Sequence, residues 1–261
     1  MAVSPLSLAL LAEPHSSANR VQVLAEALGV PVVSEPLAAD LLLRFTSDHL
    51  ELCKPGDPEL PGALWVDFAS PAARRRVSRP GDELLVRAAK VRHTVQPLLI
   101  DATAGLGRDG FLLAASGFRV WMFECNPVVA ALLADGLQRA AADPRLGEVA
   151  SRIRLRAANA LDLWPTLTER PEVIYLDPMF PQRTKTAKVK QELRLLQLLD
   201  QKTEPPEELL RAALALAIRK VVVKRPLKGP FLADRLPSYT LKGKAVRFDV
   251  YVGTGKETLP S

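Results

Sequence analysis

Four residues with clear chemical potential follow a short apolar run at positions 173–176 and read Asp177, Pro178, Met179 and Phe180. A carboxylate and a main-chain carbonyl fixed by proline can each accept one N–H bond of an exocyclic amine. Two such acceptors favour the pyramidal, attacking nitrogen over the flat one, so they act in the transition state. We therefore take Asp177 and Pro178 as candidate acceptors and Phe180 as a candidate platform that stacks on a base. A strand that ends in a proline turn with a buried Phe is the alternative.

A glycine-rich segment at residues 101–110 contains the spacing Gly-x-Gly-x-x-Gly, read from Gly105. Glycines between a strand and a helix let the backbone approach a nucleotide at the helix N-terminus. The spacing alone fits a dinucleotide as well as S-adenosylmethionine (AdoMet). Asp101 favours AdoMet, because a carboxylate there attracts the cationic methionine end and repels a pyrophosphate. Glu124 ends the next strand and can accept hydrogen bonds from both ribose hydroxyls of either cofactor. The alternative is an ordinary strand–helix turn with a surface Glu.

A third predicted strand is followed by Ala158 and Asn159. In a nucleoside-binding α/β sheet this loop lies against the base, where a short polar side chain can contact the ring edge. Asn159 is the candidate for that contact, and Ala158 allows close approach. An Asn that caps the following helix is an equal alternative.

Basic residues gather in the last third of the chain. Residues 180–261 carry 17 basic and 8 acidic side chains, whereas residues 1–179 carry 18 and 21. A local basic excess indicates a polyanionic partner, although each single residue also fits a solvated surface. The candidates for phosphate contact are Arg183, Lys185, Lys188, Lys224, Arg225, Lys244 and Arg247, and the arginines of residues 74–79 are a possible extension.

The elements that must position these residues alternate between short apolar runs and amphipathic segments. Strands are predicted at 98–100, 119–123, 153–156, 173–176 and 220–223, with helices at 109–116, 127–141 and 207–217. This alternation predicts a doubly wound parallel α/β sheet. The runs at 238–241 and 246–252 are too close for a crossover helix and should form an antiparallel hairpin. A mostly parallel sheet that ends in such a hairpin is typical of a Rossmann-like class I AdoMet-dependent methyltransferase.

The first part of the chain differs in character, because prolines interrupt it repeatedly. A hairpin is predicted at 41–45 and 50–53, a strand at 64–68, a linker at 74–81 and a helix at 82–93. We therefore expect a small N-terminal α/β module over residues 1–75 and a methyltransferase domain over residues 76–261.

Composition excludes several classes of protein. The two cysteines cannot build a disulfide framework, and the three histidines lie too far apart for a metal motif, so no metal is expected. No apolar run is long enough for a membrane span, and the N-terminus lacks the basic region of a signal peptide. A cytoplasmic protein is the expectation, with its oligomeric state open.

Four segments together resemble the RsmJ family of bacterial small-subunit (16S) rRNA guanine-N2 methyltransferases. They are residues 101–109, 124–133, 175–181 and 221–226, and the resemblance runs from about residue 60 to the end. In that family Met179 is an ordinary feature of the Asp-Pro-Met-Phe-Pro motif. The resemblance implies AdoMet contacts at Arg108 and Asp109, at Glu124 and Cys125, at Ala158 and Asn159, and at Asp177. Cys125 stands where an Arg is usual, which leaves its backbone amide as the contact.

The resulting hypothesis is a methyl transfer from AdoMet to the exocyclic N2 of one guanine in small-subunit rRNA, free or in the assembled subunit. Three alternatives stay open. In the first, the methyl acceptor is another amine, such as adenine N6 or a protein amide. In the second, the protein is an NAD-dependent oxidoreductase, as the glycine spacing alone would allow, and in the third it is an RNA-binding protein without catalytic activity.

Overall fold

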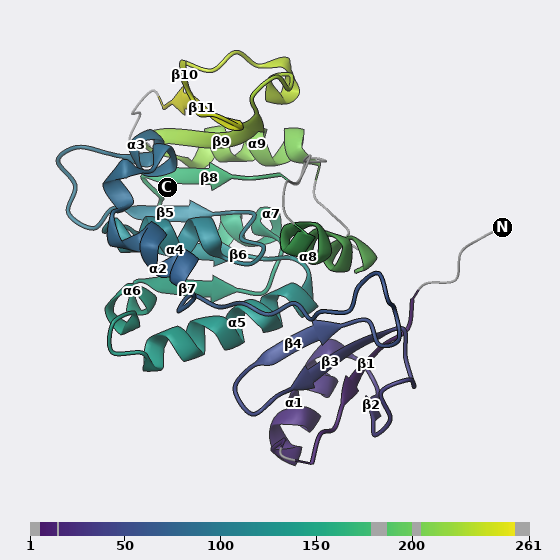
Figure 1. The fold of residues 1–261 in the computed structure, drawn as a ribbon. Helices are drawn as coiled ribbons and strands as arrows, with labels where there is room; N and C mark the ends of the chain where they lie inside the picture. The colour runs from purple at the N-terminus through teal and green to yellow at the C-terminus, as the bar shows by residue number, and fades with distance from the viewer. Residues whose placement is uncertain (1–5, 15, 179–186, 200–204, 254–261) are drawn as a thin grey trace.

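The computed structural model describes residues 6–14, 16–178, 187–199 and 205–253, without the side chains of residues 187–190. Two sheets lie beside each other, a small one from the N-terminal part and a large one from the rest (Figure 1). No helix among these residues is long and apolar enough to cross a membrane. Nor do they contain a cluster of three or more His, Cys, Asp and Glu side chains arranged to hold a metal ion.

The large sheet has seven strands in the order β10-β11-β9-β8-β5-β6-β7. Five of them run parallel: β5 (Leu98–Asp101), β6 (Arg119–Phe123), β7 (Ile153–Arg156), β8 (Val173–Leu176) and β9 (Lys220–Pro226). The other two, β10 (Tyr239–Lys242) and β11 (Val246–Val252), pair antiparallel with each other, and β11 pairs antiparallel with β9. The predicted parallel sheet and terminal hairpin are thus confirmed.

Helices cover both faces of this sheet because its central strands are apolar on both sides. On β5, Leu99 packs into the larger core, and its neighbours Leu98 and Ile100 pack into the opposite one. The larger core contains side chains of α3 (Leu84–Ala89), α4 (Arg108–Ala115), α5 (Pro127–Ala142) and α6 (Gly147–Ser151), and the other core contains side chains of α7 (Ala160–Leu163) and α9 (Pro206–Leu216). Asn126 caps α5, since its Oδ1 accepts hydrogen bonds from Val128 and Val129.

The small sheet has the order β2-β1-β3-β4 and is joined by α1 (Ala18–Leu28). Its strands are β1 (Leu8–Leu11), β2 (Val32–Val33), β3 (Leu41–Phe45) and β4 (Leu50–Cys53), and the predicted hairpin is the antiparallel pair β3–β4. The predicted strand at 64–68 is wrong, because only Leu64 forms a bridge, to Leu52. The expected linker is also wrong: Ser70 caps a helix there, α2 (Pro71–Ser78). The expected helix at 82–93 shortens to α3.

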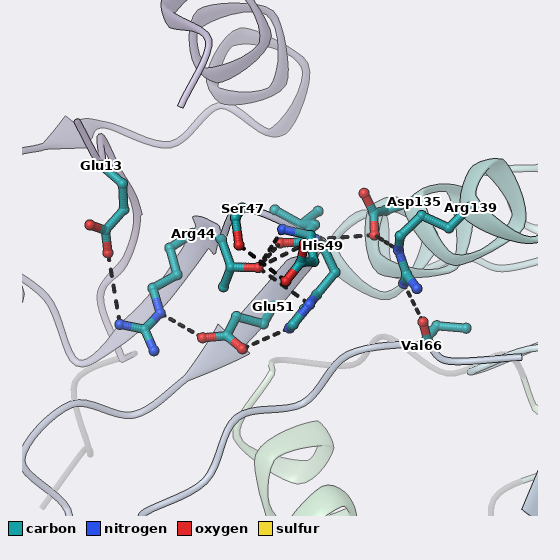
Figure 2. A network of polar contacts seen from close by, with 11 residues as sticks. Glu13, Arg44, Ser47, His49, Glu51, Val66, Asp135 and Arg139 are labelled. Atoms are coloured by element: carbon teal, nitrogen blue, oxygen red, sulfur yellow. Dashed lines mark hydrogen bonds and ion pairs between the residues drawn. The ribbon is translucent and has the colours of Figure 1, made fainter. Parts of the chain in front are cut away.

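Polar contacts hold the small sheet against α5 (Figure 2). Asp135 of α5 accepts a hydrogen bond from the Leu50 amide at 3.1 Å and another from Arg139 Nε at 2.9 Å. The Arg139 guanidinium also donates to the Val66 carbonyl. Around these contacts one apolar core continues from the small sheet to α4 and α5. The boundary expected at residue 75 falls inside α2, whose Arg76 contacts α4.

Candidate active site

The end of β8 lies directly beside the glycine-rich loop that follows β5. The backbone amide of Asp177 donates a hydrogen bond of 2.6 Å to Thr103 Oγ1. The Asp177 side chain keeps 27% of its surface exposed, and Pro178 is buried. Phe180, the predicted stacking residue, lies outside the described residues. Two of the three predicted catalytic residues therefore lie at the carboxyl edge of the sheet, where an open α/β sheet binds its ligands.

Each of the three loop glycines is required for a different physical reason. Gly105 has φ +52°, and a Cβ added there would meet nothing within 4 Å, so the space over the loop is open. Gly107 has φ +73°, and an added Cβ would lie 2.4 Å from Leu133 Cδ1. An added Cβ on Gly110 would lie 2.5 Å from Met122 Cε. The first glycine thus leaves room for a ligand, Gly107 lets the loop pack closely on Leu133 of α5, and Gly110 lets α4 pack closely on Met122 of β6.

Glu124 holds this loop from the end of β6. Its two oxygens accept hydrogen bonds of 2.8 Å from the amides of Gly105 and Asn126. Burial raises the pKa of Glu124, and the two amide bonds oppose that shift. The Cys125 thiol also lies 4.0 Å from Oε1 as a weak donor. A carboxylate offers about four acceptor positions, so Glu124 keeps acceptor capacity for a ribose hydroxyl.

A charged network links Asp177 to the start of α4. Lys224 Nζ of β9 lies 2.7 Å from Asp177 Oδ2 and 2.8 Å from Asp109 Oδ2. Asp109 also accepts a hydrogen bond of 2.6 Å from the Tyr175 hydroxyl and one of 2.8 Å from Arg76. These cations hold the pKa of Asp109 below its usual value despite burial, and the same burial raises the pKa of Tyr175, which stays protonated as a donor.

Three members of this site escaped the sequence-based prediction. Thr103 lies within the motif, and its position two residues after Asp101 was the available signal. Tyr175 precedes Asp177 by two residues, so a period of two along β8 puts both on one side. Arg76 has no such signal: the sequence predicts a linker there and suggests its arginines for phosphate contact, not for this site.

Asp101 does not line the open space as predicted. The residue is 1% exposed, and its Oδ1 accepts a hydrogen bond of 3.3 Å from the Thr103 amide below the loop. Burial, together with the charge of Asp109, raises the pKa of Asp101 well above its usual value. Its carboxyl group therefore supports the loop and is not a free negative charge facing a ligand.

The other predicted cofactor residues surround the loop. The Arg108 side chain is 54% exposed and pairs with Glu192 of α8 (Ala187–Leu198) at 2.7 Å. Cys125 is exposed at the end of β6. Asn159 caps α7, since its Oδ1 accepts a hydrogen bond of 2.7 Å from Leu161, so the capping alternative holds for this oxygen. Ala158 lies next to it, partly exposed.

The predicted phosphate contacts need correction. Arg225 and Arg247 are only 4% and 5% exposed. Both donate to the Pro230 carbonyl, and Arg247 also pairs with buried Asp249 at 2.9 Å, so they hold the chain turn after β9. Lys224 contacts carboxylates of the active site, whereas Lys244 is exposed. Arg183 and Lys185, and the side chain of Lys188, lie outside the described residues.

Of the arginines of residues 74–79, which the sequence suggested as a basic extension, Arg75 and Arg79 are exposed, whereas Arg74 and Arg76 form ion pairs. Arg74 pairs with Asp143 at 2.9 Å, and Arg76 pairs with Asp109. Both guanidinium groups therefore tie α2 to the large sheet's helices.

The residues present fit AdoMet. Gly105 leaves open space over the loop, Glu124 retains acceptor positions beside it, and Asp177 faces the same edge. A seven-stranded sheet with this strand order, carrying this loop and an Asp-Pro at the end of β8, defines an AdoMet-dependent methyltransferase of class I.

Comparison with known proteins narrows this class. The family described as "Putative SAM-dependent methyltransferase" matches residues 24–253. A protein of Thioalkalivibrio sulfidiphilus named ribosomal RNA small subunit methyltransferase J is 44% identical over 90% of this chain and 93% of its own. The protein of that name from Aeromonas hydrophila is also 44% identical, over 93% and 97%. The chain belongs to the ribosomal RNA small subunit methyltransferase J family.

A solved structure agrees with this assignment. The crystal structure of a SAM-dependent methyltransferase from Neisseria gonorrhoeae has a TM-score of 0.75 and 36% identity and covers 96% of this chain and 98% of its own. The protein is therefore an enzyme that uses AdoMet. The readings as an NAD-dependent oxidoreductase or as a non-catalytic RNA-binding protein are excluded.

Proposed function

We propose that this enzyme methylates the exocyclic N2 of one guanine in small-subunit ribosomal RNA. The relatives named above are small-subunit rRNA methyltransferases, which supports the RNA substrate. The choice of an amino group as methyl acceptor rests on the contacts of Asp177. Its Oδ2 contacts Lys224, and within the described residues its Oδ1 accepts no hydrogen bond. One carboxylate oxygen is thus available for an amine at the edge of the sheet.

The chemistry assigns separate tasks to the residues of the site. When bound, AdoMet supplies a sulfonium methyl group, so attack by guanine N2 forms the N–C bond, breaks the S–C bond and releases S-adenosylhomocysteine. Asp177 Oδ1 and the Pro178 carbonyl accept the two N–H bonds of the amine and favour its pyramidal form. The surplus proton of the methylated nitrogen passes to the Asp177 carboxylate and then to water.

The cofactor is held by the loop on the other side of this edge. The Glu124 carboxylate binds the ribose hydroxyls, and the backbone of Gly105 lets the cofactor approach closely. Arg108 and Asp109 at the start of α4, the backbone of Cys125 and the loop at Ala158 and Asn159 complete the set.

Exposed lysines support an approach of RNA to the same edge. β11 begins at Val246, which pairs with Pro226 at the carboxyl end of β9. The end of β10 and the turn before β11 therefore lie at the carboxyl edge. Lys242 ends β10 and Lys244 lies in the turn, both exposed, and Lys228 is exposed after β9. These lysines replace Arg225 and Arg247 as the proposed phosphate contacts. Since ribosomal RNA is cytoplasmic, the proposal sets the enzyme's action in the cytoplasm.

The test uses small-subunit RNA from a strain that lacks the gene. The enzyme is incubated with labelled AdoMet and either naked RNA or assembled subunits, and the nucleosides are separated by mass spectrometry. We expect label on guanine N2 in at least one substrate form. Label on adenine N6, on protein, or on no nucleoside in either form would overturn the proposal.

A further inference from the structure

Lys224 joins the two carboxylates that flank the reaction edge. Its Nζ is 2.7 Å from Asp177 Oδ2 and 2.8 Å from Asp109 Oδ2, and its side chain is 20% exposed. The pairing of β8 with β9 explains this position. Leu176 lies opposite Val223, so the next residue of each strand, Asp177 and Lys224, continues the register.

The two carboxylates depend on Lys224 to different degrees. Asp109 has a second cation, Arg76, at 2.8 Å and a donor in the Tyr175 hydroxyl. Within the described residues, the side chain of Asp177 has Lys224 as its single ion-pair partner. Loss of Lys224 would therefore leave Asp109 paired and would remove the one counter-charge that the described residues give Asp177.

The titratable groups that interact with Asp177 come from four elements. They are Lys224 of β9, Asp109 of α4, Asp101 of β5 and the protonated Tyr175 of β8. Burial and the negative charge of Asp109 raise the pKa of Asp177, and Lys224 opposes both. A protonated Asp177 would carry a hydroxyl donor on one oxygen, which is the wrong partner for an N–H group, and its remaining acceptor oxygen would be neutral and weaker.

We propose that Lys224 is the positioning residue of methyl transfer: it keeps Asp177 a carboxylate and holds Oδ2, so that Oδ1 stays directed at the amine. This inference rests on the proposed function of Asp177 as the amine acceptor. Lys224 is thereby assigned away from RNA phosphates, and it touches neither the amine nor the methyl group.

The test is the pH dependence of single-turnover methyl transfer at saturating AdoMet. Lys224→Met removes the charge from a side chain of similar length. An opposite charge at this distance shifts a carboxyl pKa by about 1–3 units, so the acid limb of the rate profile should move up by about that much. The rate should recover towards wild type at high pH. Lys224→Arg keeps the charge and should keep the wild-type limb.

Lys220→Met is the matched control on the same strand, because Lys220 Nζ donates to the Ala88 and Lys90 carbonyls away from the carboxylates. Its acid limb should not move. If Lys224→Met does not fold, Lys224→Gln gives the same readout, with a donor but no charge. A loss of rate that is equal at every pH, or an unmoved limb, would overturn the proposal.

This experiment separates the inference from the proposed function. The wild type is assayed on whichever nucleoside it labels, so a wrong guess about guanine N2 changes the substrate but not the pH comparison. Conversely, label on guanine N2 together with an unmoved acid limb overturns only the role of Lys224.

Discussion

The backbone amide of Asp177 donates its hydrogen bond to the Oγ1 of Thr103, over 2.6 Å. This bond joins the end of β8, which carries the proposed amine acceptor, to the loop after β5, which is the proposed cofactor loop. We therefore expect this threonine hydroxyl to help set the spacing between methyl donor and methyl acceptor, together with the direct pairing of β5 and β8.

Thr103→Val removes that hydroxyl at nearly constant shape. Leaving the partly buried Asp177 amide without its acceptor costs about 1–3 kcal/mol of stability. The Asp177 backbone is then no longer held at Thr103 and can shift relative to the loop. We expect kcat to fall about tenfold or more while AdoMet affinity, measured by calorimetry, changes much less. Thr103→Ser keeps the hydroxyl and should retain most of the rate. Equal rates for Thr103→Val and wild type would contradict this role.

Asp177→Asn replaces the proposed amine acceptor by an amide that offers one acceptor oxygen and an NH2 group with two donors. Loss of a transition-state acceptor of this kind costs about 10²–10³ in kcat. The expected result is a folded protein with an unchanged melting temperature and hardly any methyl transfer in a single-turnover assay. Turnover near the wild-type rate would remove Asp177 from catalysis.

Glu124→Gln tests the ribose contact. Hydrogen bonds to a charged group contribute about 1.5–3 kcal/mol each, so the Kd for AdoMet should rise at least tenfold. In the wild type, burial raises the pKa of Glu124, and the acceptor form is lost as pH falls through that pKa. AdoMet affinity should thus weaken on the acid side, and Glu124→Gln should lose this dependence. Glu148→Gln is the control, since the Glu148 side chain is 83% exposed on α6.

Gly107→Ala, compared with Gly117→Ala, separates the cost of close packing from the cost of backbone strain. Gly107 combines φ +73° with a contact of 2.4 Å between an added Cβ and Leu133, whereas Gly117 has φ +102° and open space. Strain costs about 1–2 kcal/mol, and overpacking adds about 1–3. Thermal or urea unfolding should therefore show a loss of about 2–5 kcal/mol for Gly107→Ala and about 1–2 for Gly117→Ala. Equal losses would mean that the contact relaxes freely.

Substitutions of Arg247 and Lys244 distinguish a cation that stabilises the fold from one that contacts RNA. Arg247→Ala leaves buried Asp249 without its partner, which costs about 3–5 kcal/mol of stability. Lys244→Ala should leave the melting temperature unchanged, weaken RNA binding and reduce the slope of log affinity against log salt by about 0.7. Filter binding at several salt concentrations measures this slope. An unchanged slope would remove Lys244 from the RNA surface.

Local pattern was enough to predict most of the large sheet. The segments at 119–123, 173–176 and 246–252 form strands with the predicted bounds, because their apolar runs are bounded by clear turn signals. Asn126 followed by Pro127 likewise marks a helix start wherever it lies in the fold. The small sheet was harder, since its short segments derive their stability from partners far along the chain.

The sequence by itself determined the class of cofactor, and it predicted the loop that would bind it, Glu124 as a ribose contact and Asp177 as an amine acceptor. Motifs carry this information because their backbone needs are local: glycine at positive φ, a cap, a carboxylate after a strand. Only the tertiary structure decided which charges meet. It buried Asp101, Arg225 and Arg247, and it brought Lys224 to Asp177. Burial and ion pairing depend on which strands lie side by side, and a charged residue type does not encode its neighbour across a sheet.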